Sequence, residues 1–165
     1  MPIGPRKEAM SPQLPPAARA IAAAITEAER CASAAEPASF AEAAGTLALL
    51  DQSQVRIVLG DLVRMLLEER HPDGLSTDDI RDLLERCSRS AAPWFPAVDP
   101  NVLVVVLTGA LGMQDPEAAG APPLAVAQHA TLLIADLRAV AGRPLQGYLD
   151  SALAEIARAE TIEMP

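Results

Sequence analysis

Aromatic residues are scarce in this chain of 165 residues, which has one Trp, one Tyr and two Phe. Half of the residues are nevertheless hydrophobic, and alanine supplies much of that half. β-Sandwiches and β-barrels build their strands from β-branched and aromatic side chains, so this composition argues against them. It is also too hydrophobic for a chain that stays disordered throughout. The length fits one domain that buries roughly two-thirds of its unfolded surface.

Basic residues are the second shortage. The chain has 22 acidic residues against 13 Lys and Arg, which gives a net charge of −9 at pH 7, and no segment forms a basic stripe. Proteins that bind nucleic acids or anionic membranes use clustered basic side chains to neutralise phosphates. We therefore expect neither nucleic acid nor a membrane surface as a partner.

Long apolar runs and paired cysteines are also missing. The most apolar stretch, 102–113, is too short to span a bilayer, and the N-terminus lacks the apolar run of a signal peptide. Cys31 and Cys87 lie far apart without a C-x-x-C spacing, which predicts two free, buried thiols. These features together predict a soluble cytoplasmic protein.

Helical periodicity dominates the rest of the sequence. Ser76 and Asp79 have the spacing of a capping box, and Asp99-Pro100 is typical of an N-cap followed by proline in the first turn. Apolar stripes and such end signals predict helices over 16–35, 38–50, 54–70, after Ser76, over 101–113 and 124–141, and from Pro144 onward. The expected fold is an all-α single-domain bundle of six or seven helices over 17–165. Residues 1–16 carry five prolines and predict a flexible, disordered Pro-rich tail; a docking role for this tail is the less favoured alternative.

The positions of two segments in the fold need a separate argument. Residues 102–113 are apolar on all sides, which fits either a central helix buried on every side or a lone buried strand favoured by its valines. No second convincing strand exists to pair with it, so we predict the helix. The Ala-rich N-terminal third is expected to form a cover over a core that lies in the last two-thirds.

Residues for catalysis are few. His71 lies in a turn near several acids but without a metal-ligand spacing, and His129 lies seven residues before Asp136, only roughly on the same helix face. A solvated turn and a histidine satisfied by a neighbour are the simpler interpretations. No Walker loop or dinucleotide fingerprint is present. We therefore predict no enzyme activity, no catalytic residue, no metal site and no cofactor.

One loop attracts attention because it holds half of the aromatic residues. Trp94 and Phe95 lie between prolines in 91–100. Trp and Phe are enriched at the centres of protein interfaces, so one hypothesis is that this pair packs on a second subunit or a protein partner. The alternative is that the pair closes the end of its own bundle. The first hypothesis predicts a binding protein that self-associates, most simply as a homodimer.

The alternative function is the sensing of an apolar small molecule. Apolar pockets between helices are common in bundles, and helices over 102–113 and 124–140 would line one here. The candidate pocket residues are Val105, Gln128, His129 and Leu133, with Gln128 or His129 as the polar anchor. The arrangement loosely resembles the ligand-binding regions of bacterial helical repressors, without a motif that identifies a family.

Overall fold

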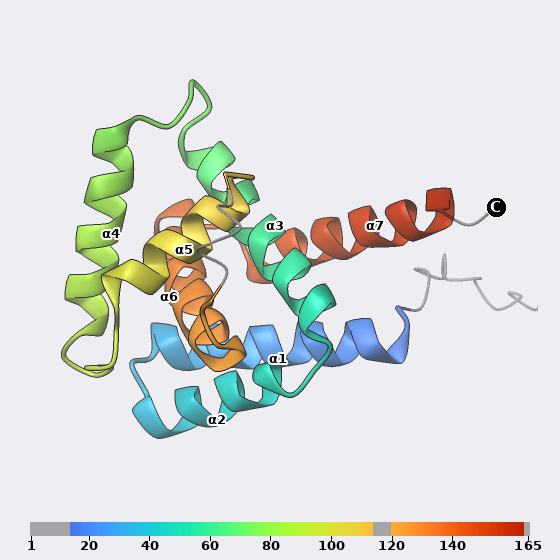
Figure 1. Cartoon of the computed structure of the whole chain (residues 1–165), viewed down its shortest axis with the longest axis horizontal. Coiled ribbons are helices and arrows are strands. Elements are labelled where there is room, and N and C mark those ends of the chain that lie inside the picture. Colours follow the sequence, from blue (N-terminus) through green and yellow to red (C-terminus); the bar gives the residue numbers. More distant parts are fainter. Residues whose placement is uncertain (1–13, 114–119, 164–165) are drawn as a thin grey trace, which may run out of the picture.

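The computed structural model describes residues 14–113 and 120–163. Over these residues the chain forms seven α-helices and no strand, which confirms the all-α fold (Figure 1). The helices are α1 (Pro16–Ser33), α2 (Pro37–Ala48), α3 (Gln52–Arg70), α4 (Thr77–Ala91), α5 (Pro100–Ala110), α6 (Pro123–Ala141) and α7 (Leu145–Glu163). The predicted bounds agree to within a few residues. The first helix begins at Pro16, as predicted, and residues 1–13 of the predicted tail lie outside the described residues.

The helix ends are set by local side-chain chemistry. Ser76 and Asp79 form the predicted capping box, in which each side chain accepts a hydrogen bond from the other residue's backbone N–H. The carboxylate of Asp51 accepts from two N–H groups at the start of α3, and Asp99 accepts from the N–H of Asn101 at the start of α5. Gly142 ends α6 in the left-handed conformation, with φ of 71°. The side-chain caps satisfy N–H donors that the start of a helix leaves unpaired, and Gly142 turns the chain away at the end of α6, so these residues fix where the helices begin or end.

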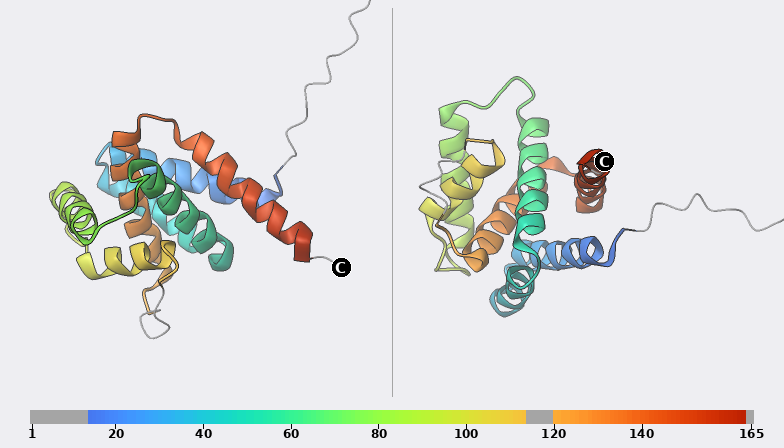
Figure 2. Two further views of the ribbon diagram at one scale, coloured as in Figure 1. Left: turned by 90° about the horizontal axis from the view of Figure 1, so that it is seen from above. Right: turned by 45° about the vertical axis from the view of Figure 1, so that its right-hand side comes forward.

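Helix α6 is the centre of the bundle. It packs against α1, α2, α3, α4 and α5 and runs through the middle of the molecule in the views of Figures 1 and 2. Its buried side chains face several directions: Ala127, His129, Ala130, Thr131, Leu132, Leu133, Ile134 and Leu137. Among the described helices, α6 alone is long and apolar enough to cross a membrane by length and composition. A helix that is buried on several sides needs apolar residues on all of those sides, which explains the apolar composition of α6.

The prediction that residues 102–113 form the central helix, buried on every side, was therefore wrong. Residues 102–110 are helical as predicted, but only Leu103 and Leu107 of α5 are buried, and Val104 is exposed. Helix α5 lies on the outside of α3 and α6 and covers them with one face. Leu124 and Val140, near the two ends of α6, are also exposed. Periodicity locates an apolar face but does not say which helix the others surround.

The Ala-rich N-terminal third also belongs to the core. Helices α1 and α2 pack side by side along one edge of the bundle (Figure 1) and both contact α6. Ile21, Ile25 and Phe40 are among the largest fully buried side chains. The prediction of a cover over a core in the last two-thirds was therefore wrong. Alanine permits the close approach of α1 and α2, so that their few large side chains reach the interior.

Buried polar groups join distant parts of the chain. Glu29 on α1 is 4% exposed and accepts hydrogen bonds from Arg138 on α6 and from Ser33. Arg86 on α4 pairs with Asp136 on α6 at 2.7 Å. Because each carboxylate has a hydrogen-bonding partner, its burial is compensated. Cys31 and Cys87 are free and buried, as predicted.

Candidate functional site

His129 is a structural residue in this fold. Its Nδ1 lies 2.7 Å from the carbonyl oxygen of Ala125, and its Nε2 accepts a hydrogen bond from the backbone N–H of Asp99 at 2.9 Å. A neutral ring with the proton on Nδ1 satisfies both contacts. Burial lowers the pKa of His129, against opposing effects of Ala125 and Asp99. Both ring nitrogens of His129 are therefore used, and neither is free to hold a ligand. Asp136, the carboxylate that could have oriented the ring, pairs with Arg86 instead.

Trp94 and Phe95 lie against the core of their own chain. Phe40 contacts both rings edge-on, with centroid distances of 5.1 Å to Trp94 and 5.4 Å to Phe95. Phe95 also meets the ring of His129 at 6.0 Å. Both side chains remain partly exposed. The pair therefore packs on the core of its own chain, and contact of its exposed portions with a partner stays a separate proposal.

The predicted pocket residues do not converge on one cavity. Leu133 is fully buried in the core and His129 is nearly so, while Gln128 is half-buried on α6. Of these four residues, Val105 lines the pocket of about 310 Å³ that is described next. Val105 faces α3 because α5 crosses both α3 and α6. The pocket predicted from the sequence did not include α3.

A pocket that Val105 lines lies between α3, α5 and α6. It encloses about 310 Å³ and is partly open to solvent. Its lining comes from three helices: Arg56, Ile57, Leu59, Gly60 and Asp61 of α3, Val105, Val106, Gly109 and Ala110 of α5, and Val126 and Ala130 of α6. Small residues explain the space, since Gly60 faces Ala110 and Gly109 has no atom within 4 Å of the position where its Cβ would lie.

Two charged side chains line this otherwise apolar pocket. Arg56 donates a hydrogen bond from Nη2 to the carbonyl oxygen of Ala121 at 3.3 Å. Asp61 accepts from Arg64 at 3.1 Å, and burial is the main cause that raises the pKa of its carboxyl group. Ile57 keeps 51% of its surface exposed at the pocket. An apolar lining with a few polar groups is the usual composition of a small-molecule site.

Of the individual residues predicted for the pocket only Val105 lines it, although both predicted lining helices contribute residues, and the whole contribution of α3 was missed. The available signal was the glycine in the interior of each of two predicted helices, Gly60 and Gly109. A glycine inside a helix lowers its stability relative to alanine and often marks a place where space or close approach matters. That signal does not say which helices face each other, so the pocket required the fold.

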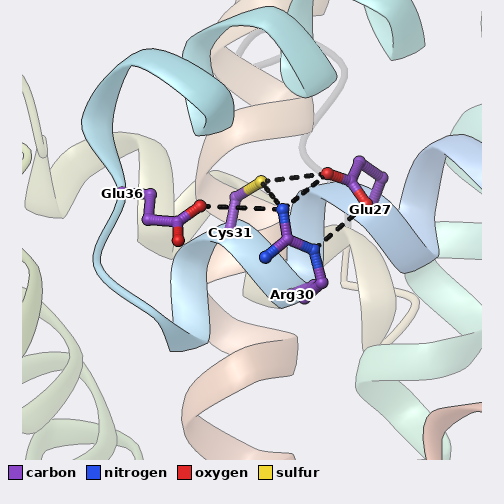
Figure 3. Close-up of polar contacts among 4 residues, drawn as sticks. All are labelled: Glu27, Arg30, Cys31 and Glu36. Atoms are coloured by element: carbon purple, nitrogen blue, oxygen red, sulfur yellow. Dashed lines mark hydrogen bonds and ion pairs between the residues drawn. The ribbon is translucent and has the colours of Figure 1, made fainter.

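A second polar cluster lies on α1 and the turn that follows it. Figure 3 shows Arg30 between Glu27 and Glu36, with the thiol of Cys31 beside it. The thiol lies 3.5 Å from both Glu27 Oε1 and Arg30 Nη2. Burial and the hydrogen bond to Glu27 raise the pKa of Cys31, and burial raises the pKa of Cys87 to about 12. A raised pKa keeps a thiol protonated, so neither cysteine is prepared for nucleophilic attack.

Metal-ligand geometry is not found in the part of the chain that the structure describes. No group of three or more His, Cys, Asp or Glu side chains is placed to hold an ion there. Nδ1 of His71, at the turn between α3 and α4, lies 3.7 Å from Oδ2 of Asp79, the partner of Ser76 in the capping box of α4. Its position fits the simpler interpretation of a polar turn.

A further cavity of about 230 Å³ lies between α1, α3 and α7. Its lining is apolar apart from Gln54, so it offers no charged group to orient a ligand.

Comparison with protein-family models, curated proteins and solved structures finds no match. The pocket between α3, α5 and α6, hereafter the α3/α5/α6 pocket, is therefore the site on which a functional proposal rests.

Proposed function

We propose that this chain is a non-catalytic binding protein that holds a small, mainly apolar ligand in the α3/α5/α6 pocket. The observation that carries the proposal is the 310 Å³ space between three helices, with an apolar lining and only Arg56 and Asp61 as charged side chains. Its volume lies at the lower end of the range of about 300–1,000 Å³ found for ligand pockets. This proposal follows the ligand-sensing alternative, with a pocket shifted from His129 to α3.

The absence of paired catalytic groups supports binding over catalysis. Asp61 is held by Arg64, and among the described residues no histidine, cysteine or hydroxyl side chain lines the pocket. General acid–base and nucleophilic mechanisms both need such a group within reach of the bound molecule. What the lining offers is apolar contact area and charge at two positions, which are the means of recognition.

A thermal shift screen with apolar compounds tests the proposal. A compound at about ten times its Kd stabilises the fold by ~1.4 kcal/mol, which corresponds to a rise in Tm of about 3–5 °C for a domain of this size. We expect such rises for apolar compounds small enough for the pocket, and chemical shift changes in NMR spectra at residues of α3, α5 and α6. A screen in which no apolar compound raises Tm contradicts the proposal.

Two glycine variants supply the matched control. Gly109→Leu adds a side chain at a residue of the pocket lining that has open space around it, whereas Gly45→Leu makes the same change on α2, where there is also open space. Both replace a helical glycine, so both are expected to fold. Loss of binding in Gly109→Leu alone places the ligand in the α3/α5/α6 pocket, and equal binding in the two variants places it elsewhere.

A further inference from the structure

The two charged groups of the α3/α5/α6 pocket lie at different points along α3. Arg56 and Asp61 are five residues apart, which corresponds to about 7.5 Å along a helix axis. Arg56 lies on the side of the pocket where the chain enters α6, because it contacts the carbonyl of Ala121. Asp61 follows Gly60, which faces Ala110 near the end of α5. The pocket therefore presents unlike charges at separate places.

The negative charge is compensated within the protein. Arg64, one turn further along α3, donates to Asp61 at 3.1 Å and to Glu155 on α7 at 3.3 Å. Asp61 is also well covered, with 21% of its side chain exposed. A carboxylate that already has a guanidinium partner gains little from a second cation.

The positive charge is not compensated in the same way. Among the described residues, Arg56 forms one hydrogen bond, to a neutral carbonyl, and has no carboxylate within ion-pair distance. A guanidinium presents five N–H donors in a planar fork that matches a carboxylate or a similar anion. Arg56 thus has donors to spare at the edge of an apolar space.

We propose that the ligand of this pocket is an amphiphile with one anionic group, held by Arg56, and an apolar body that lies against Val105, Val126 and Ala130. This inference rests on the proposed function and names the ligand's chemical class. The apolar body fills the space left by the glycines, and the anion supplies the charged partner that Arg56 does not find among the described residues. An ion pair with a half-buried guanidinium gives stronger and more directional hydrogen bonds than a neutral group does.

Octanoate and octanamide separate the two proposals, because they share the apolar chain and differ in charge. We expect calorimetric titration of the full-length protein to show binding of both, with octanoate about tenfold tighter at low salt. Arg56→Gln should remove that preference and leave the Kd for octanamide unchanged, while Arg56→Lys should keep part of it. Arg81→Gln is the matched control, since Arg81 lies exposed on α4 away from the pocket, and it should retain the wild-type preference.

Each other outcome has a defined meaning. Equal affinity for octanoate and octanamide in the wild-type protein overturns the anionic ligand and leaves the pocket as an apolar site. A preference for octanoate that persists in Arg56→Gln also overturns the assignment to Arg56. Failure of both probes to bind, together with a thermal shift screen without hits, overturns the proposed function itself.

Discussion

The backbone N–H of Asp99 donates a hydrogen bond to Nε2 of His129 at 2.9 Å. The contact joins the loop before α5 to the central helix α6. The side chain of Asp99 also caps α5 by accepting from the N–H of Asn101. One residue thus fixes the start of α5 and its attachment to α6, and the position of α5 determines one wall of the α3/α5/α6 pocket.

This contact makes the stability of the fold depend on pH. Burial lowers the pKa of His129 in the folded state, so between the folded and unfolded pKa values the unfolded chain binds more protons. The free energy of unfolding therefore falls as the pH drops below about 6.5, the ordinary value for histidine. Protonation of Nε2 also removes the acceptor that the Asp99 N–H uses. Urea unfolding at about pH 7.5 and about pH 5 measures the change.

His129→Leu provides the comparison. At neutral pH we expect this variant to lose about 1–3 kcal/mol, because the N–H of Asp99 is left without its acceptor. The same variant should show a smaller loss of stability between neutral and acid pH than the wild-type protein. An identical pH dependence in the two proteins would show that His129 is not the group responsible.

The pair of Glu29 and Arg138 predicts a second stability effect. Arg138→Met leaves the carboxylate of Glu29, whose side chain is 6% exposed, with only Ser33 as a partner. Breaking a fully buried pair costs about 3–5 kcal/mol, and the partial exposure of Arg138 reduces the expected loss to about 2 kcal/mol.

The double variant Glu29→Gln/Arg138→Met tests the cause of that loss. It should be more stable than Arg138→Met alone, since it no longer buries an unpaired charge. Equilibrium unfolding in urea gives both free energies. A double variant that is less stable than the single one contradicts the role of Glu29 as the uncompensated charge.

The variant Trp94→Ala distinguishes a role of Trp94 in packing within the chain from a role in self-association. Trp94→Ala removes the edge-on contact with Phe40, and we expect a loss of about 1–3 kcal/mol in the free energy of unfolding. If the exposed part of this pair also forms a homodimer interface, the variant should in addition weaken the dimer in sedimentation equilibrium. A dimer whose dissociation constant is unchanged in Trp94→Ala rules out this interface, and a wild-type protein that is monomeric at all concentrations rules out the homodimer.

Local signals carried the prediction of the helices, and long-range contacts decided what it missed. The capping residues Ser76 and Asp99 act within a few residues of their own position, so the sequence alone places the starts of α4 and α5. The central position belongs to α6 and not to α5, although α5 has the more uniformly apolar sequence. Which helix is surrounded depends on crossing geometry that no single segment encodes.

The site was predictable to a smaller extent than the fold. Val105 was assigned to a pocket because it lies on an apolar helix, and it does line one. His129 was the natural polar anchor by residue type, yet its two ring nitrogens are used by Ala125 and Asp99. Arg56 could not be distinguished from the other arginines of the exposed helix faces, because only the folded arrangement shows that no carboxylate of residues 14–113 and 120–163 pairs with it.

The glycines of the pocket and of the helix end predict effects of opposite sign. A Cβ at Gly60 would lie 3.9 Å from the Cα of Ala110, an ordinary contact distance, so Gly60→Ala should stabilise α3 by about 0.5–1 kcal/mol through its helix propensity. Gly142 ends α6 at φ of 71°, a conformation that costs an alanine about 1 kcal/mol, so Gly142→Ala should destabilise the protein. Thermal unfolding of the two variants beside the wild-type protein measures both shifts. A fall in Tm for Gly60→Ala would mean that the added Cβ lies closer to the Cα of Ala110 than 3.9 Å. The pocket would then be narrower at this point.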